Sequence, residues 1–190
     1  MVSKFVKYIS FVLLSGLCSC HWDDNMPKPI GYFKISLPEK TYVQFDKQGC
    51  PYTFEINKAV NISDKNRNPC WHDLNYTVLH SVIQLTYRPI HNNLDTLLKD
   101  AREFAYKHGV KADGIAEKIY IDPDRKVYGI LYEIYGNTAT NYQFFATDSL
   151  RHFIRGTAYV HSQPNLDSTA PVTHFLGDEI RHLMETLQWK

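Results

Sequence analysis

The polar and apolar positions of the chain follow a helical period in two segments. Over 94–108 apolar side chains recur every three or four residues, Asn92-Asn93 offers an N-cap, and Gly109 ends the pattern. A second apolar stripe follows Pro171, a residue suited to the first turn of a helix, and runs to Leu187. The spacing therefore predicts one helix at 94–108 and another that begins at 171.

The segments before and between these helices have the period of strands. Alternation is clearest at 81–87, where apolar Ile83 and Leu85 flank Gln84 and Pro89 stops the pattern. Turn residues at 122–125 and 148–150 predict two hairpins, and 164–169 is expected to form a loop. The predicted strands are 32–37, 42–45, 52–56, 59–62, 81–87, 115–121, 126–135, 141–147 and 151–160.

Strands and helices in this order predict an α+β fold. We expect an antiparallel β-sheet with helices packed on it, as a single layered domain. Helix, hairpin, hairpin, helix is also the order of the PsbP/Mog1-type sandwich, a resemblance of topology alone.

Composition and charge exclude several classes of protein. The chain has 190 residues, a mean hydropathy of −0.36 and no apolar run of about 18 residues, which argues against a polytopic membrane protein. Lys and Arg number 21 against 20 Asp and Glu, so the formal net charge is +1. Without a basic excess, nucleic acid is not an expected partner.

The first twenty residues resemble an export signal. Lys4 and Lys7 precede a largely apolar stretch of ten residues, 8–17, and no acidic residue occurs before Cys20. Leu17 lies three residues before Cys20 and a serine directly before it, as in the cleavage site of bacterial lipoproteins. We predict that residues 1–19 are removed and that Cys20 is acylated; the alternative is a secreted protein cut nearby.

The remaining chain divides into a tether and a domain. Residues 20–30 lack apolar periodicity and carry two prolines, so they are expected to form a lipid-anchored tether. Residues 31–190 are predicted to form the single folded domain. The chain would then reach the membrane through acyl chains on Cys20, with no need of a basic surface.

Cys50 and Cys70 would be the two thiols left after processing. In an oxidising compartment their simplest use is a disulfide, which would stabilise the fold by roughly 3 kcal/mol. The alternative is a metal site that also uses His72, but this spacing matches no known zinc module. We therefore predict a disulfide and no metal.

Candidate catalytic groups form no recognised motif. No nucleophile elbow or glycine-rich phosphate loop is present, so we predict no catalytic residue, no cofactor and no enzyme activity. On the last helix a polar face could hold a divalent ion, although a solvated face is favoured. That face comprises His174, Asp178, Glu179, His182 and Glu185. Four carboxylates that could pair in an acid–base site are Glu55, Asp113, Glu117 and Glu133.

Tyrosines gather in the predicted hairpins. They could form a recognition surface, although strand propensity explains them as well and is favoured. They are Tyr128, Tyr132, Tyr135, Tyr142 and Tyr159.

Several short motifs resemble one family over essentially the whole mature chain. They are Lys28-Pro29-Ile30-Gly31-Tyr32-Phe33, Leu37-Pro38-Glu39-Lys40, Cys50-Pro51-Tyr52, Pro69-Cys70-Trp71, Ala105-Tyr106-Lys107-His108, Lys111-Ala112-Asp113, Val127-Tyr128-Gly129-Ile130-Leu131-Tyr132, Gln143-Phe144-Phe145, His152-Phe153-Ile154-Arg155-Gly156 and His182-Leu183-Met184-Glu185-Thr186. The pattern is similar to that of the gliding-motility lipoprotein GldD of Bacteroidetes. The resemblance implies a cell-envelope lipoprotein needed for gliding and linked to type IX secretion, with no catalytic residues to carry over.

This resemblance shapes the functional prediction. Because the chain ends on a predicted packed helix rather than a sorting domain, we expect secretion machinery rather than cargo. The predicted function is a noncatalytic accessory or scaffold lipoprotein that binds other envelope proteins. We expect it at the outer membrane, facing the periplasm. The alternative is an envelope hydrolase, or a glycan or lipid binder, with a cleft floored by the tyrosine-bearing sheet.

Overall fold

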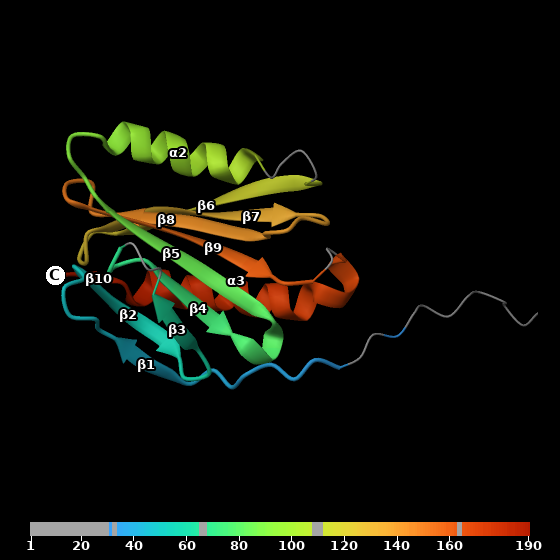
Figure 1. The fold of residues 1–190 in the computed structure, drawn as a ribbon. Coiled ribbons are helices and arrows are strands. Elements are labelled where there is room, and N and C mark those ends of the chain that lie inside the picture. The colour runs from blue at the N-terminus through green and yellow to red at the C-terminus, as the bar shows by residue number, and fades with distance from the viewer. Residues whose placement is uncertain (1–30, 32–33, 65–67, 108–111, 163–164) are drawn as a thin grey trace, which may run out of the picture. The chain divides into compact units, whose positions relative to one another are not determined.

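Seven antiparallel strands form the larger of two sheets in a computed structural model of the chain (Figure 1). The structure describes residues 31, 34–64, 68–107, 112–162 and 165–190, and the account below concerns 34–190. In order across the large sheet the strands are β3 (Asn61–Asp64), β4 (His72–Tyr76), β5 (Ser81–Pro89), β9 (His152–Val160), β8 (Tyr142–Thr147), β7 (Val127–Tyr135) and β6 (Gly114–Asp122). Strands that lie side by side in this sheet are also consecutive along the chain, except for β5 and β9, which pair with each other.

A small sheet joins the two ends of the described chain. Its strands, in order, are β1 (Tyr42–Phe45), β2 (Tyr52–Asn57) and β10 (Gln188–Trp189). Trp189 pairs with Tyr52 and donates a hydrogen bond from its indole to the carbonyl of Lys126, at 3.0 Å. The C-terminal residues are thereby fixed against the domain.

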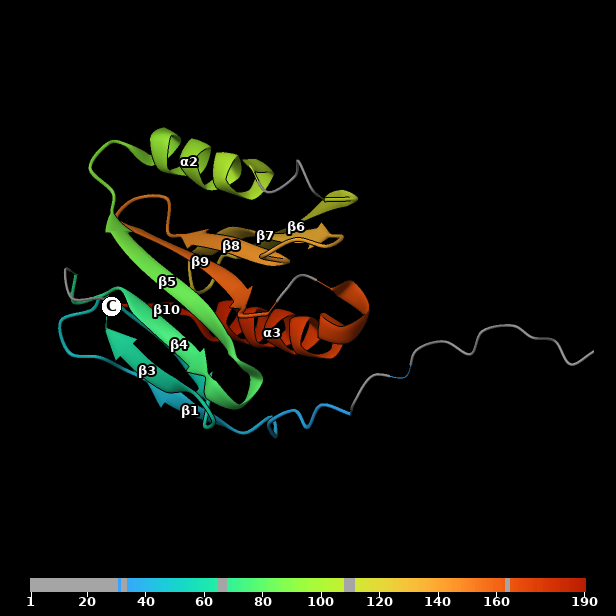
Figure 2. The same cartoon turned by 45° about the vertical axis from the view of Figure 1, so that its right-hand side comes forward.

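Two α-helices lie on opposite faces of the large sheet (Figures 1 and 2). The helix α2 (Leu94–Lys107) covers the strands β7, β8 and β9, whereas α3 (Leu166–Thr186) packs against β5, β8 and β9 and also against β2. A short 3₁₀ helix, η1 (Thr77–Leu79), links β4 to β5. This is the predicted α+β arrangement of an antiparallel sheet with packed helices, and that prediction is confirmed.

The main core lies on the α3 face of the large sheet. Leu176, Ile180 and Leu183 of α3 pack with side chains of both sheets, such as Phe54 and Leu85. All five are at most 1% exposed. Burial of such side chains stabilises the fold by about 1.5–3 kcal/mol each.

A smaller core lies under α2. Leu97, Ala101 and Ala105 form the buried stripe of the helix and pack on Tyr132 and Phe145 of the sheet. Because two of the three helical residues are alanines, α2 lies close to the strands and buries less apolar area than α3 does.

One glycine position depends on close packing between β8 and β9. The ring of Phe144 lies where a Cβ on Gly156 would be, and the end of Leu85 lies 2.9 Å from that point. The absence of a side chain at Gly156 thus makes room for Phe144 in the main core.

The sequence predicted most of these elements and misplaced a few. β4 was missed. The stretch Lys34–Leu37 of the predicted first strand is not a strand, and 32–33 lie outside the described residues. The last helix begins at Leu166 rather than Pro171, because Asn165 caps it by accepting a hydrogen bond from the Ser168 amide at 3.4 Å. The prediction of a loop at 164–169 was therefore wrong from Leu166 onward.

No helix among the described residues is both long enough and apolar enough to cross a lipid bilayer.

Candidate functional site

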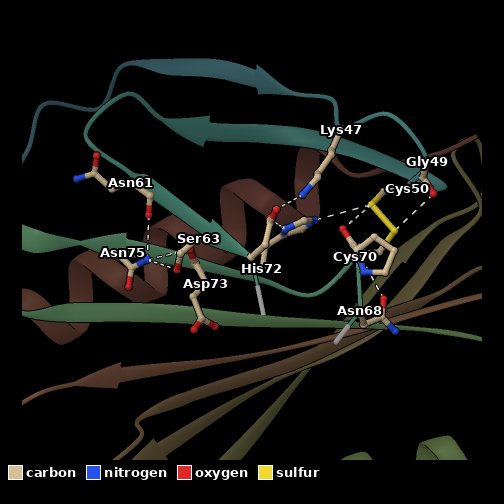
Figure 3. A network of polar contacts seen from close by, with 12 residues as sticks. Lys47, Gly49, Cys50, Asn61, Ser63, Asn68, Cys70, His72, Asp73 and Asn75 are labelled. Atoms are coloured by element: carbon tan, nitrogen blue, oxygen red, sulfur yellow. Dashed lines mark hydrogen bonds and ion pairs between the residues drawn. A yellow bond between two sulfur atoms is a disulfide. The ribbon is translucent and has the colours of Figure 1, made fainter. Parts of the chain in front are cut away.

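The two cysteines meet at the starts of β2 and β4 (Figure 3). Cys50 and Cys70 form a disulfide with a Cα–Cα distance of 5.4 Å. Their side chains belong to the main core and are 2% and 5% exposed. The bond therefore ties the small sheet to the edge of the large sheet from inside the core.

An Asp–His pair adjoins this disulfide. His72, on β4, pairs in register with Asp64 of β3, and its Nδ1 lies 2.9 Å from Asp64 Oδ1. His72 Nε2 lies 3.8 Å from the Sγ of Cys50. Lys47 forms an ion pair with the other oxygen of Asp64. A lysine, a carboxylate, an imidazole and a sulfur thus form one continuous polar chain.

The charges along this chain are set by burial and pairing. His72 is fully buried, and burial lowers its pKa, although its hydrogen bond with Asp64 opposes that effect. Hydrogen bonds from Lys47 and His72 lower the pKa of Asp64. With Nδ1 donating to the Asp64 carboxylate, the Nε2 of a neutral His72 is an acceptor that faces Cys50. If the disulfide were reduced, this atom could accept the thiol proton.

The candidate metal residues of α3 are separated by their contacts. Asp178 forms ion pairs with Lys40 and Arg181, and His182 lies 2.8 Å from Glu55. The remaining members differ in burial: His174 and Glu185 are exposed, whereas Glu179 is 4% exposed. Among the described residues no group of three or more His, Cys, Asp or Glu side chains could hold a metal ion.

Glu179 corrects the expectation of a solvated face. Its carboxylate accepts hydrogen bonds from the hydroxyls of Tyr76, at 2.9 Å, and Tyr42, at 3.1 Å, and from the Asn57 amide at 3.4 Å. Burial and the nearby carboxylate raise the pKa of Tyr76 and raise that of Tyr42 to about 12. Both hydroxyls therefore stay protonated as donors, and the network links α3 to β1, β2 and β4.

Asp113 and Glu133, two of the four candidate carboxylates, line the same cavity of about 140 Å³, which His174 also lines. Glu55 contacts His182, Glu117 contacts Tyr106 and Arg102, and Glu133 contacts Lys118, Arg181 and Tyr135. Asp113, directly before β6, lies beside Gly136, directly after β7, and its amide donates a hydrogen bond to the carbonyl of Tyr135 at 2.9 Å. The contacts of Glu55, Glu117 and Glu133 are ion pairs and side-chain hydrogen bonds within the fold.

The hairpin tyrosines do not share one open face. Tyr132 is buried under α2, and Tyr142 is buried in the main core on the opposite face. Tyr135 is 51% exposed, and Tyr128 and Tyr159 are partly buried. Tyr135 and Tyr142 line one small cavity, but the five tyrosines do not together form the floor of a single cleft in the described hairpins.

The edge strand β6 carries a surface that sequence reasoning did not single out. Within the described chain, β6 pairs with β7 alone. Its side chains Ile119 and Ile121 are 74% and 65% exposed. Both point to the α2 side of the sheet, because they alternate with Lys118 and Tyr120. The sequence predicted a strand at 115–121, but only the strand order shows that this strand lies at the edge of the sheet.

Comparison with known proteins identifies the family. The family model described as gliding motility lipoprotein GldD matches residues 22–189. The chain belongs to the GldD family. The family prediction made from the short motifs is confirmed, and the chain is placed among lipid-anchored proteins of the cell envelope. Cys20 lies outside both the matched and the described residues, so its acylation stays a prediction.

Other comparisons add little to the GldD assignment. No curated protein matches the chain. A solved structure, the solution structure of cyanobacterial PsbP (CyanoP) from Synechocystis sp. PCC 6803, is 8% identical and has a TM-score of 0.47. The match covers 85% of this chain and 99% of that chain. At this identity and score, the likeness has no bearing on activity or partners.

Proposed function

We propose that this protein is a noncatalytic accessory lipoprotein of the gliding and type IX secretion machinery. It is held at the outer membrane by acyl chains on Cys20 and binds another envelope protein through its folded domain. Membership of the GldD family over 22–189 carries the proposal. The exposed edge β6 supports it by supplying a place for a protein partner.

The backbone of β6 is suited to binding an extended segment. This strand is nine residues long, and in the described chain one side of its backbone has no neighbouring strand. Unpaired N–H and C=O groups on such an edge can pair with a strand from another protein. Main-chain hydrogen bonds would supply affinity at this edge.

The side chains of β6 give the edge two unlike faces. On the α2 side Ile119 and Ile121 are exposed, and their cross-strand neighbours are Ile130 and Tyr128. On the other side Lys118 pairs with the buried Glu133. Large exposed apolar residues beside an open edge are typical of interaction sites rather than of free surface. An added strand would cover the two isoleucines.

Site-specific photocrosslinking in intact cells tests this proposal. A crosslinking amino acid at Ile119 should give an adduct with a protein of the envelope motility or secretion machinery, identified by mass spectrometry. Val78 is 80% exposed and lies in η1, away from β6, so the same probe there is the matched control. The adduct should be absent at Val78, and it should disappear when Ile121 is replaced by lysine.

The result that would overturn the proposal is equally specific. Ile119 and Val78 giving the same adducts, or Ile119 giving none while the protein is correctly localised, would exclude β6 as the binding edge. Protease treatment of intact and permeabilised cells tests location. Protection in intact cells and cleavage after permeabilisation are expected for a domain that faces the periplasm.

A further inference from the structure

A cavity lies between α2 and the strands β5 and β9 of the large sheet. Its volume is about 180 Å³. The sheet contributes Arg88 from β5 and Arg155 from β9, the helix contributes Asp100 and Phe104, and Trp71 lies at the edge. The lining thus combines two arginines, one carboxylate and two aromatic rings.

Arg155 is the unusual member of this lining. Its guanidinium carbon lies 4.0 Å from the ring centroid of Phe104, so the ring covers one face of the cation. Among the described residues this guanidinium forms no hydrogen bond or ion pair, and its partly buried side chain keeps its nitrogen atoms accessible from outside the core. A guanidinium has five N–H donors. These donors are available to a ligand that enters the cavity.

Arg88 brings a second positive charge to the same place. In the pairing of β5 with β9, Arg88 lies opposite Phe153 and Thr86 lies opposite Arg155. The two arginines are thus diagonal neighbours on one face of the sheet, within reach of each other for long side chains. Burial lowers the pKa of Arg155, Arg88 lowers it further, and Asp100 acts in the opposite direction. With one carboxylate against two guanidinium groups, the cavity keeps a positive charge.

The size of the cavity limits what it can hold. Sites that enclose drug-sized ligands occupy roughly 300–1,000 Å³. A cavity of about 180 Å³ is smaller, so it can hold one charged group and the carbon atoms next to it. The aromatic rings of Phe104 and Trp71 favour a flat apolar group beside that charge.

We propose that this cavity is a binding site for a carboxylate attached to an apolar group, with Arg155 and Arg88 holding the carboxylate. Carboxylates match the planar fork of arginine and form two parallel hydrogen bonds with it. Phe104 and Trp71 would contact the apolar part. The ligand is either a small aromatic acid or the C-terminal carboxylate of a protein that ends in an apolar residue. The site lies on the sheet and α2, apart from the edge β6, and does not depend on the function proposed above.

Titration calorimetry with the full-length chain in nonionic detergent and phosphate-free buffer tests the proposal. The probes are phenylacetate, a short peptide that ends in phenylalanine with a free carboxylate, and the same peptide with an amidated end. Both acids should bind, and the amidated peptide should not. Tighter binding of the free peptide than of phenylacetate would identify a protein C-terminus as the source, and the reverse would identify a small acid.

Variants then locate the binding. Arg155→Gln and Arg88→Gln should each weaken acid binding by about 10- to 100-fold, as expected for loss of a hydrogen-bonded charge. Arg151→Gln, at an exposed arginine in the β8–β9 turn outside the cavity lining, is the matched control and should bind as the parent does. Should Arg155→Gln fail to fold, Arg88→Gln still decides, because Arg88 is exposed.

Three results would each overturn this proposal. One is the absence of binding by either acid at millimolar concentration. Another is equal binding by the amidated peptide, which would show that the charge is not used. The last is unchanged acid binding by the Arg88 and Arg155 variants when the Arg151 variant behaves as the parent.

Discussion

The two faces of the large sheet are covered to different extents. On the α3 face, Leu176 and Leu183 are 1% exposed and the small sheet completes the cover. On the α2 face, Phe104 is 44% exposed and Ile119 of β6 is 74% exposed. The α3 face therefore carries most of the stability. The α2 face leaves aromatic and charged side chains accessible to a partner or ligand.

Two charged side chains, one on each face, also differ in how many hydrogen-bond partners they have. On the α3 face, Glu179 is satisfied by hydrogen bonds from Tyr76, Tyr42 and Asn57. On the α2 face, Arg155 has the ring of Phe104 beside it but no hydrogen-bond acceptor among the described side chains. Glu179 therefore serves the fold, as most buried polar groups with partners do. The guanidinium of Arg155 remains available to a molecule outside the chain.

Truncating one leucine on each face gives the largest expected effect. Leu183→Ala should lower the free energy of unfolding by about 3–5 kcal/mol, because its cavity lies inside a fully enclosed core. Leu97→Ala on α2 should cost less, about 2–3 kcal/mol, because Leu97 lines an open cavity and its neighbours can relax. Urea unfolding of the full-length chain measures both. Equal costs, or a larger cost at Leu97, would contradict the comparison.

Opening the disulfide is expected to have the next largest effect. The Cys50–Cys70 bond closes a loop with a sequence separation of 20 and lies in the core of the α3 face. Its loss should lower the free energy of unfolding by about 3 kcal/mol on the chain-entropy model. Urea unfolding with and without a phosphine reductant measures this, and a Cys50→Ser, Cys70→Ser variant is the control. An unchanged unfolding midpoint would show that the bond does not stabilise this face.

Removing one hydroxyl from the Glu179 network should have a smaller effect. Tyr76→Phe leaves a buried carboxylate with one donor fewer, which should cost about 1–3 kcal/mol. Tyr42→Phe removes one of two donors to the other oxygen of Glu179, where Asn57 remains, and Tyr42 is only partly buried, so water can replace it. Thermal unfolding should therefore show a larger shift for Tyr76→Phe. The reverse order would mean that this network is open to solvent.

Local pattern was enough to predict much of the fold. The strand 42–45 and the start of the helix at Leu94 were predicted as they occur, because alternation and helical period depend on neighbours along the chain. β4 was missed because its sequence, His-Asp-Leu-Asn-Tyr, begins its inward positions with the polar His72, which is nevertheless buried beside a disulfide. Its strand character comes from pairing with β3 and β5 rather than from propensity.

The candidate site was less predictable than the fold. Cys50 and Cys70 could be paired by counting cysteines, but Asp64 and His72 meet only through the register of β3 with β4. Glu179 lies on a polar stripe of its helix, and no local pattern indicates that two tyrosines from distant strands contact its carboxylate. Such contacts are set by tertiary packing, which a single sequence does not reveal.

The pH dependence of the free energy of unfolding is expected to be the smallest of these effects. The pKa of the buried His72 is lowered by burial, so below its ordinary value of 6.5 the unfolded chain binds a proton that the folded chain resists. Stability should fall as the pH decreases from 7 to 5.5, by less than about 1.4 kcal/mol per pH unit for one proton. Burial also lowers the pKa of His152, which contributes in the same direction.

Two histidine variants test whether the loss of stability at lower pH comes from His72 on the α3 face. His72→Gln should reduce the decline in the free energy of unfolding between pH 7 and 5.5, measured by urea unfolding at each pH, and leave the part due to His152. His174→Gln, at an exposed position on α3, is the matched control and should leave the decline in place. Because His72 contacts the disulfide and Asp64, a decline that His72→Gln does not change would mean that protonation there is tolerated. The polar chain beside Cys50 would then be open to water, and the α3 face would be less closed than its burial indicates.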